Sequence, residues 1–212
     1  DKYNIRKKAT FIDNQNLRVG DSIIEAKSIV IATGSSPSIP SMFDGLGDLL
    51  VVNDDIFEWK NLPESVAVFG PGVIGLELGQ ALHRLGVRIR VFGSSGSLRP
   101  LSDLKIKNYA ENIFRKEFAI DTKSKLFGIK REYDKAKIMF LDRANGVEKE
   151  ETFDYVLVAT GRSPNIKGLR LENTSLKLDS KGVPEFDPYT MQCGDSSIFI
   201  AGDANNILPV LH

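Results

Sequence analysis

Gly70-Pro71-Gly72-Val73-Ile74-Gly75 is the stretch that decides the fold of this chain, because of the segments on either side of it. Residues 65–69 before it form a short run of apolar β-formers, which indicates a buried parallel strand. Residues 73–85 after it carry apolar side chains at helical spacing, Gly86 provides a C-cap, and residues 87–92 have the pattern of another strand. The sequence therefore predicts a strand–helix–strand unit with a glycine-rich turn at its first corner.

The three glycines of this turn have separate physical roles. Gly70 permits the tight turn out of the strand, Gly72 lets the backbone approach a pyrophosphate, and Gly75 lets the helix pack close to the sheet. The first N–H groups of the helix, at Val73 and Ile74, are expected to offer hydrogen bonds and a partial positive charge to phosphates. A glycine-rich turn that binds nothing is the alternative, but the position between strand and helix favours a dinucleotide site.

Composition limits the classes of partner. The chain has 212 residues, enough for one or two domains, and its 28 basic and 28 acidic side chains cancel. No overall field therefore favours nucleic acid or an anionic membrane. The sequence has no run of membrane-spanning length and no secretory signal pattern, and its single cysteine cannot close an internal disulfide. We expect a cytoplasmic protein without nucleic-acid or membrane partners.

A repeat indicates the wider architecture. Residues 25–37 and 152–164 each contain a buried strand that runs into Ala-Thr-Gly and then a Ser-Pro turn, and alternating segments typical of a β-meander precede both. A second helix is expected at about 103–117, and residues 197–203 supply another buried strand that ends in Gly-Asp. The chain starts at Asp1 without a methionine, so we also expect a fragment of a longer protein.

The predicted fold class is α/β. A Rossmann-like, three-layer domain with a β-meander is expected at residues 42–161. Residues 1–41 and 162–212 are expected to form parts of a second domain of similar plan, whose own glycine-rich strand is absent from the chain.

These motifs, in this order, resemble those of the pyridine nucleotide–disulfide oxidoreductases, the flavoenzymes that include dihydrolipoamide dehydrogenase, glutathione reductase and mercuric reductase. The matching segments extend nearly end to end and lie at residues 32–35, 70–79, 159–165 and 201–203. The GLELG segment at 75–79 is most similar to dihydrolipoamide dehydrogenase. The resemblance implies that 42–161 is the NAD(P)-binding domain and that 1–41 and 162–212 belong to an FAD-binding domain.

The resemblance also implies cofactor-binding residues. Those expected to hold the nicotinamide dinucleotide are Gly70, Gly72, Val73, Ile74, Gly75, Glu77, Gly161 and Arg162, the last two bordering the nicotinamide. Those expected to contact FAD are Thr33, Gly34, Ser35, Gly202 and Asp203, with Asp203 on the ribityl chain. Glu77 has the alternative of a solvated glutamate favoured by the helix dipole, and Asp203 that of an N-cap.

The sequence departs from the family pattern in its cysteines and histidines. The redox-active cysteine pair is absent, and so is the C-terminal dimerisation domain with its His–Glu pair. Cys193 is expected to be a surface or half-buried thiol, and neither His83 nor His212 is assigned to catalysis. We expect no catalytic residue and no metal ligand in this chain.

A further departure concerns the choice of nucleotide. The acidic residue that would hold the adenosine ribose is replaced by Gly93-Ser94-Ser95-Gly96-Ser97. A carboxylate there would repel a 2′-phosphate, whereas Ser94, Ser95 and Arg99 can donate hydrogen bonds to one. We therefore add Gly93, Ser94, Ser95 and Arg99 to the expected cofactor-binding residues. The GLELG resemblance favours NAD and the local chemistry favours NADP, so both stay open.

The parent protein is expected to be a homodimeric flavoenzyme similar to dihydrolipoamide dehydrogenase. It would move electrons between NAD(P)(H) and a small-molecule or protein-bound disulfide or dithiol through FAD. The fragment alone is expected to bind NAD(P)(H) weakly, hold FAD poorly and turn nothing over. Two alternatives remain: a flavin-dependent NAD(P)H oxidoreductase without redox cysteines, similar to ferredoxin reductases, and a non-catalytic nucleotide-binding module.

Overall fold

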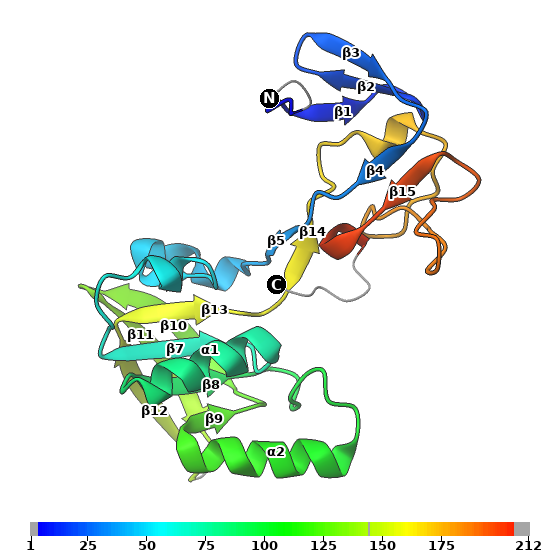
Figure 1. Ribbon diagram of the computed structural model, residues 1–212. Coiled ribbons are helices and arrows are strands. Elements are labelled where there is room, and N and C mark those ends of the chain that lie inside the picture. Colours follow the sequence, from blue (N-terminus) through cyan, green and yellow to red (C-terminus); the bar gives the residue numbers. More distant parts are fainter. Residues whose placement is uncertain (1–3, 144, 206–212) are drawn as a thin grey trace. The chain divides into compact units, whose positions relative to one another are not determined.

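The chain divides into two compact units in a computed structural model that describes residues 4–143 and 145–205 (Figure 1). Unit 1 comprises residues 1–36 and 162–212, and unit 2 comprises residues 37–161. The second unit thus begins at Pro37, slightly before the boundary expected at Met42. Which unit binds which cofactor stays a prediction, and His212 lies outside the described residues.

Unit 2 is built on a five-stranded sheet with the order β6-β13-β7-β8-β9. Each neighbouring pair is parallel. The strands are β6 (Leu50–Val51), β7 (Ser65–Phe69), β8 (Arg88–Phe92), β9 (Ala119–Asp121) and β13 (Tyr155–Val158). Every residue of β7 is buried, as a central parallel strand with both faces covered requires.

Two α-helices connect the strands of this sheet. Helix α1 (Val73–Arg84) joins β7 to β8, and α2 (Leu104–Glu117) joins β8 to β9. Asp103 caps α2, since its carboxylate accepts the Ile106 N–H at 3.0 Å. The helix after the glycine-rich turn and the second helix are therefore confirmed.

The two-residue period of β7 divides the core of unit 2 between two layers. Val66 and Val68 pack in one cluster with side chains of α1 and α2. Ala67 and Phe69 point the other way, into a cluster with the antiparallel meander β10 (Leu126–Glu132), β11 (Lys135–Asp142) and β12 (Val147–Phe153). The expected three-layer α/β fold with a β-meander is confirmed.

Short 3-10 helices complete both units. They are η1 (Ser41–Leu49) and η2 (Asp55–Glu58) in unit 2, and η3 (Leu171–Asn173) and η4 (Gly202–Asn205) in unit 1. Phe43, Leu46 and Leu49 of η1 are buried on the meander side of the five-stranded sheet. This helix therefore packs on the same face of the five-stranded sheet as the meander.

Unit 1 joins segments that lie far apart in the sequence. Its antiparallel meander is β1 (Ala9–Phe11), β2 (Asn16–Val19) and β3 (Ser22–Glu25). Strand β4 (Ile29–Ile31) then pairs in parallel with β15 (Ile198–Ile200). Both strands contribute buried isoleucines to one hydrophobic cluster.

Two expectations about segments outside the five-stranded sheet are wrong. The segments expected as Ser-Pro turns form short strands, β5 (Ser35–Pro37) and β14 (Arg162–Pro164), which pair with each other.

Cys193 is 0% exposed rather than a surface or half-buried thiol. Its N–H donates to the Ile198 carbonyl at 2.8 Å, so the polar turn around it packs against β15 and covers the side chain. Burial raises the pKa of the Cys193 thiol to about 11, so it stays protonated at neutral pH.

Asp154 ties the segment between β12 and β13 to the start of β7. Its carboxylate accepts the Ser65 N–H at 2.8 Å and the Ser65 hydroxyl at 3.0 Å, and it pairs with Lys135. Burial opposes ionisation of this group, but the hydrogen bonds from Lys135 and Ser65 outweigh it. Together they hold the pKa of Asp154 below its ordinary value.

We expect Asp154→Asn to lower the free energy of unfolding by about 1–3 kcal/mol at neutral pH, because the variant loses the charge that pairs with Lys135 and strengthens the hydrogen bonds from Ser65. A lowered folded-state pKa stabilises the fold above the ordinary carboxyl pKa, and this contribution is lost as the pH falls through the folded-state value. Denaturant titrations at neutral and acidic pH should therefore show the difference between wild type and variant shrinking in acid. A difference that stays constant would contradict this account.

Candidate functional site

The carboxyl ends of three parallel strands place the predicted nucleotide residues at one edge of the unit 2 sheet. Residues 70–75 follow β7, Gly93 follows β8, and Gly161 comes soon after β13. From β7 the chain proceeds through β8 to β9 on one side, whereas β13 lies on the other side of β7. This reversal is the topological switch point, where open α/β sheets bind ligands.

Contacts within the protein explain why two of the three positions, Gly70 and Gly75, must be glycine. Gly70 has a φ of 110°, and a Cβ on it would lie 2.2 Å from the Ala159 carbonyl oxygen. A Cβ on Gly75 would lie 2.0 Å from the Gly70 carbonyl oxygen. Any side chain at either position would therefore displace backbone, because contacts this short do not occur between unbonded atoms.

Gly72 differs from the other two because no described atom lies within 4 Å of the position that a Cβ would take. Its φ of −92° is open to any residue, so neither backbone strain nor packing calls for glycine here. Gly72 is also the N-cap residue of α1, which has no side-chain cap. A Cβ would fill the space in front of the helix N-terminus, which is where a phosphate group binds to such an end.

The loop after β8 contacts the glycine-rich turn. A Cβ on Gly93 would come within 2.6 Å of Pro71 Cγ, and the Arg99 N–H donates to the Pro71 carbonyl at 3.2 Å. The side chains of Ser94, Ser95 and Arg99 are exposed around this contact. The structure therefore brings both groups of predicted nucleotide-binding residues together.

Three other predicted residues of the nucleotide group lie at different places. Glu77 is exposed on α1. Gly161 follows β13 in unit 2, and its carbonyl accepts the Ser38 N–H at 2.9 Å. Arg162 belongs to unit 1, so the structure places these two neighbours in separate units. The predicted role of both at the nicotinamide stays a prediction.

Arg162 is held among the residues predicted at FAD. Its guanidinium donates to Ser35 Oγ at 2.7 Å and to the Ser35 carbonyl at 2.6 Å, and it lies 3.8 Å from the Asp203 carboxylate. Ser35 Oγ donates in turn to Asp203 Oδ2 at 2.8 Å. The side chains of Arg162 and Asp203 are only 10% and 15% exposed, so this triad fixes the Ser35 segment against the start of η4.

Asn165 is a member of this network that the sequence interpretation missed. Its amide group donates to the Thr33 carbonyl at 3.1 Å, and its backbone N–H donates to the Gly34 carbonyl at 2.9 Å. Gly34 has a φ of 67°, which glycine adopts without strain. The signal was the position of Asn165 at the end of the second Ala-Thr-Gly segment, where its side chain can reach back to the first.

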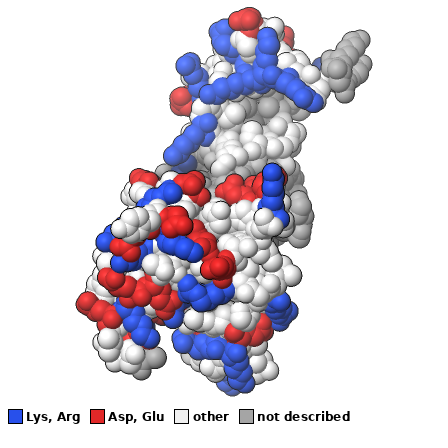
Figure 2. All heavy atoms as spheres, turned by 90° about the vertical axis from the view of Figure 1, so that its left-hand side faces the viewer, with Lys and Arg blue, Asp and Glu red and all other residues white. Residues whose placement is uncertain are grey.

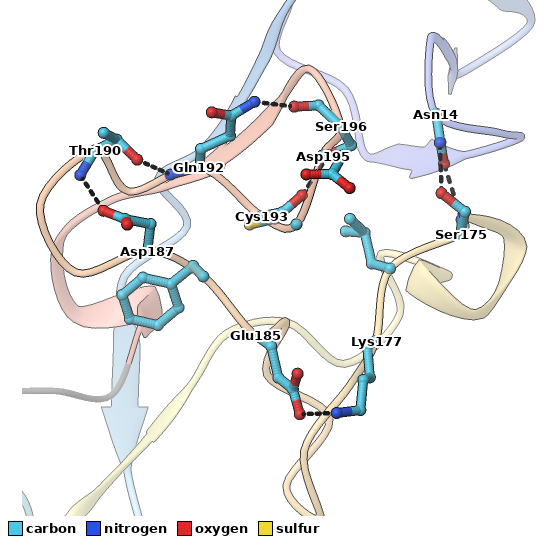
Figure 3. A pocket seen from close by; sticks show the side chains of 13 residues that line it. Asn14, Ser175, Lys177, Glu185, Asp187, Thr190, Gln192, Cys193, Asp195 and Ser196 are labelled. Carbon is cyan, nitrogen blue, oxygen red and sulfur yellow. Dashed lines mark hydrogen bonds and ion pairs between the residues drawn. The ribbon is translucent and has the colours of Figure 1, made fainter.

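The cavity of about 820 Å³ in Figure 3 lies elsewhere in unit 1. Two pairs of its polar side chains contact each other: Lys177 pairs with Glu185 at 2.9 Å, and the Asn14 amide donates to Ser175 Oγ at 2.7 Å. None of the predicted cofactor-binding residues lines it. In the described part of the chain, no group of three or more His, Cys, Asp or Glu side chains is placed to hold a metal ion.

An open parallel sheet with a glycine-rich turn at its switch point is the architecture of Rossmann-like proteins. A profile of the family described as pyridine nucleotide-disulphide oxidoreductase matches residues 2–212. The chain therefore belongs to the pyridine nucleotide-disulphide oxidoreductase family.

Named relatives agree with this assignment. A mercuric reductase of Staphylococcus aureus is 32% identical over 200 residues, which are 94% of this chain and 36% of that protein. A dihydrolipoyl dehydrogenase of Chlamydia pneumoniae is 32% identical over 185 residues, which are 86% of this chain and 38% of that protein. The chain thus spans less than half the length of these relatives.

The fold itself has a counterpart among solved structures. The Cu(II) complex of the HOCl-induced flavoprotein disulfide reductase RclA from Escherichia coli matches 96% of this chain with a TM-score of 0.83. The match covers 46% of that protein at 21% identity, so it shows a common fold.

None of the described helices is long and apolar enough to cross a membrane.

The triad predicts a coupled energetic contribution from Arg162 and Asp203. We expect Arg162→Gln and Asp203→Asn each to lower the free energy of unfolding by about 1–3 kcal/mol, because each removes one charge of a nearly buried ion pair. The double variant should lose less than the sum of the two. Arg84→Gln is the control, since its pair with Glu117 is more exposed and should contribute less to stability. Strict additivity in denaturant unfolding would show that the triad is not a unit.

Proposed function

We propose that this chain forms the nicotinamide-dinucleotide-binding domain and part of the FAD-binding domain of a flavoprotein similar to dihydrolipoyl dehydrogenase. The complete protein would transfer electrons between NAD(P)(H) and a small-molecule or protein-bound dithiol or disulfide through FAD. Family membership supports the reaction class. We further propose that the complete protein is a cytoplasmic homodimer.

The observation that carries the proposal is the empty space in front of Gly72. Gly70 and Gly75 are explained by contacts inside the protein, whereas Gly72 has no described neighbour that excludes a side chain. A pyrophosphate bound against the uncapped start of α1 would explain why position 72 is a glycine. The residues present therefore fit a dinucleotide.

The chain's own groups would bind and orient rather than react. Backbone N–H groups at Val73 and Ile74 would hold the pyrophosphate, and Ser94, Ser95 and Arg99 would receive the adenosine end. In unit 1, the Arg162–Ser35–Asp203 triad would keep the loop of Thr33 and Gly34 in one conformation beside FAD. When bound, the nicotinamide and the flavin supply the hydride chemistry themselves.

Mercuric ion is the second candidate substrate. The mercuric reductase and the dihydrolipoyl dehydrogenase compared above have the same identity to this chain, 32%. Oxidation of NADH or NADPH by the complete protein, with lipoamide in one assay and Hg(II) in another, separates the two. A complete protein without flavin would contradict both and leave a nucleotide-binding module.

The Gly72 argument predicts the effect of a single methyl group. We expect Gly72→Ala to weaken binding of NADH and NADPH roughly ten- to hundredfold, because the methyl overlaps the ligand. Its cost in stability should not exceed about 1 kcal/mol. Isothermal titration calorimetry measures the affinity, and thermal unfolding the stability.

Gly45→Ala is the matched control for this experiment. Gly45 also lies in unit 2 and has no described neighbour within 4 Å of its Cβ position, but it is outside the glycine-rich turn. Its substitution should leave nucleotide affinity unchanged. Equal affinities for Gly72→Ala and wild type would show that no ligand approaches this helix end.

The loop after β8 predicts a change of nucleotide preference. We expect Ser94→Asp to weaken NADPH binding at least about tenfold, because its carboxylate would face the 2′-phosphate. NADH binding should remain or improve, since a carboxylate can accept bonds from the ribose hydroxyls. Ser41→Asp, at another exposed serine of unit 2, should change neither affinity. Parallel loss of both nucleotides in Ser94→Asp would contradict a specificity role for this loop.

A further inference from the structure

Unit 1 carries a set of exposed cations that the proposed function does not use. We call them the basic face, and they are Arg6, Lys7, Lys8, Arg18, Lys167 and Arg170. Among the described residues, none of the six lies within 4.0 Å of a carboxylate. In unit 2, by contrast, Arg84, Arg88 and Arg90 all pair with glutamates.

Contacts within unit 1 bring these cations together from two separate segments. The Lys8 ammonium lies 3.3 Å from the Cβ position of Gly168, so it covers the turn that carries Lys167 and Arg170. The Phe11 N–H donates to the Leu169 carbonyl at 2.7 Å, which fixes β1 beside the same turn. Figure 2 shows Lys and Arg side chains gathered over the end of unit 1 that holds β1–β3.

The second half of the basic face lies on the β1–β3 meander. The Lys7 side chain lies against Gly20 in the turn between β2 and β3. Arg18 is paired with Thr10 on one side and Ile23 on the other. Lys7 and Lys8 therefore lie along the surface of the fold and do not project as a flexible basic tail.

Two exposed isoleucines accompany the cations. Ile23, the cross-strand neighbour of Arg18, is 60% exposed, and Ile5, next to Arg6, is 54% exposed. Exposed apolar side chains that are rimmed by polar and charged groups can mark a protein interaction site. Duplex nucleic acid would neutralise the cations but offers the isoleucines little apolar surface, and no exposed aromatic side chain is present among described residues 4–25 for stacking on single strands.

We propose that the basic face is a docking surface for an acidic segment of a partner protein. Carboxylates of that segment would pair with the cations, and its apolar side chains would cover the exposed isoleucines. Electrostatic attraction of this kind raises association rates and sets the orientation of docking more than it adds affinity. The proposal concerns unit 1 alone and does not depend on nucleotide binding in unit 2.

The test uses the full 212-residue chain and a fluorescein-labelled decaglutamate peptide, followed by fluorescence anisotropy at low and physiological salt. We expect salt-sensitive binding to the wild type. The triple variant Lys7→Gln, Lys8→Gln, Lys167→Gln should bind roughly tenfold more weakly, because three exposed ion pairs are lost. The corresponding Lys→Arg triple variant should retain binding, since it keeps the three charges.

A charge-matched control separates the basic face from net charge. The triple variant Lys60→Gln, Lys105→Gln, Lys116→Gln removes three exposed cations from unit 2 and should leave peptide binding unchanged. Equal loss in both Gln triples, or no binding by the wild type, would overturn the proposal. Tighter binding to duplex DNA or phosphatidylserine vesicles than to the peptide, abolished by the Lys7/Lys8/Lys167 change, would also overturn it in favour of that partner.

Discussion

The close approach of the glycine-rich turn to the end of β13 is the constraint on which unit 2 depends. Gly70 lies so near the Ala159 carbonyl that even one methyl group would collide with it, and Gly75 packs equally tightly on Gly70. These contacts join the ends of two adjacent strands to the start of α1. The helix end is thereby held at the switch point of the sheet, with its N–H groups uncapped and facing the space in front of Gly72.

Local patterns determine the elements that the sequence predicts well. The β7 run of apolar residues begins and ends where the pattern places it, and α1 begins at Val73. Asp103 signals the start of α2 because its carboxylate can accept a free N–H of the first turn, whatever the helix packs against. Such features depend on neighbours in the sequence, so a single sequence suffices to find them.

Features that depend on distant partners were missed. Cys193 has polar neighbours along the chain, and only the packing of its turn on β15 buries it. The Ser-Pro segments form strands because they pair with each other, although they lie far apart in the sequence. No local pattern indicates such a pairing. For the candidate site, the sequence predicts the residues of both glycine-rich loops, but not the triad of Arg162 with Ser35 and Asp203, whose members come from three segments. The cofactor roles of all these residues stay predictions.

The pairing of β4 with β15 has a consequence for the order of folding during synthesis. These strands are separated by the whole of unit 2, so their pairing must close a very long loop. Unit 2 is continuous in sequence, and the Ser38 N–H donates to the Gly161 carbonyl at 2.9 Å, which brings its two ends together. A folded unit 2 therefore shortens the effective loop, and the ribosome delivers it before β15 emerges. Folding of unit 2 thus lowers the entropic cost of the later pairing between β4 and β15.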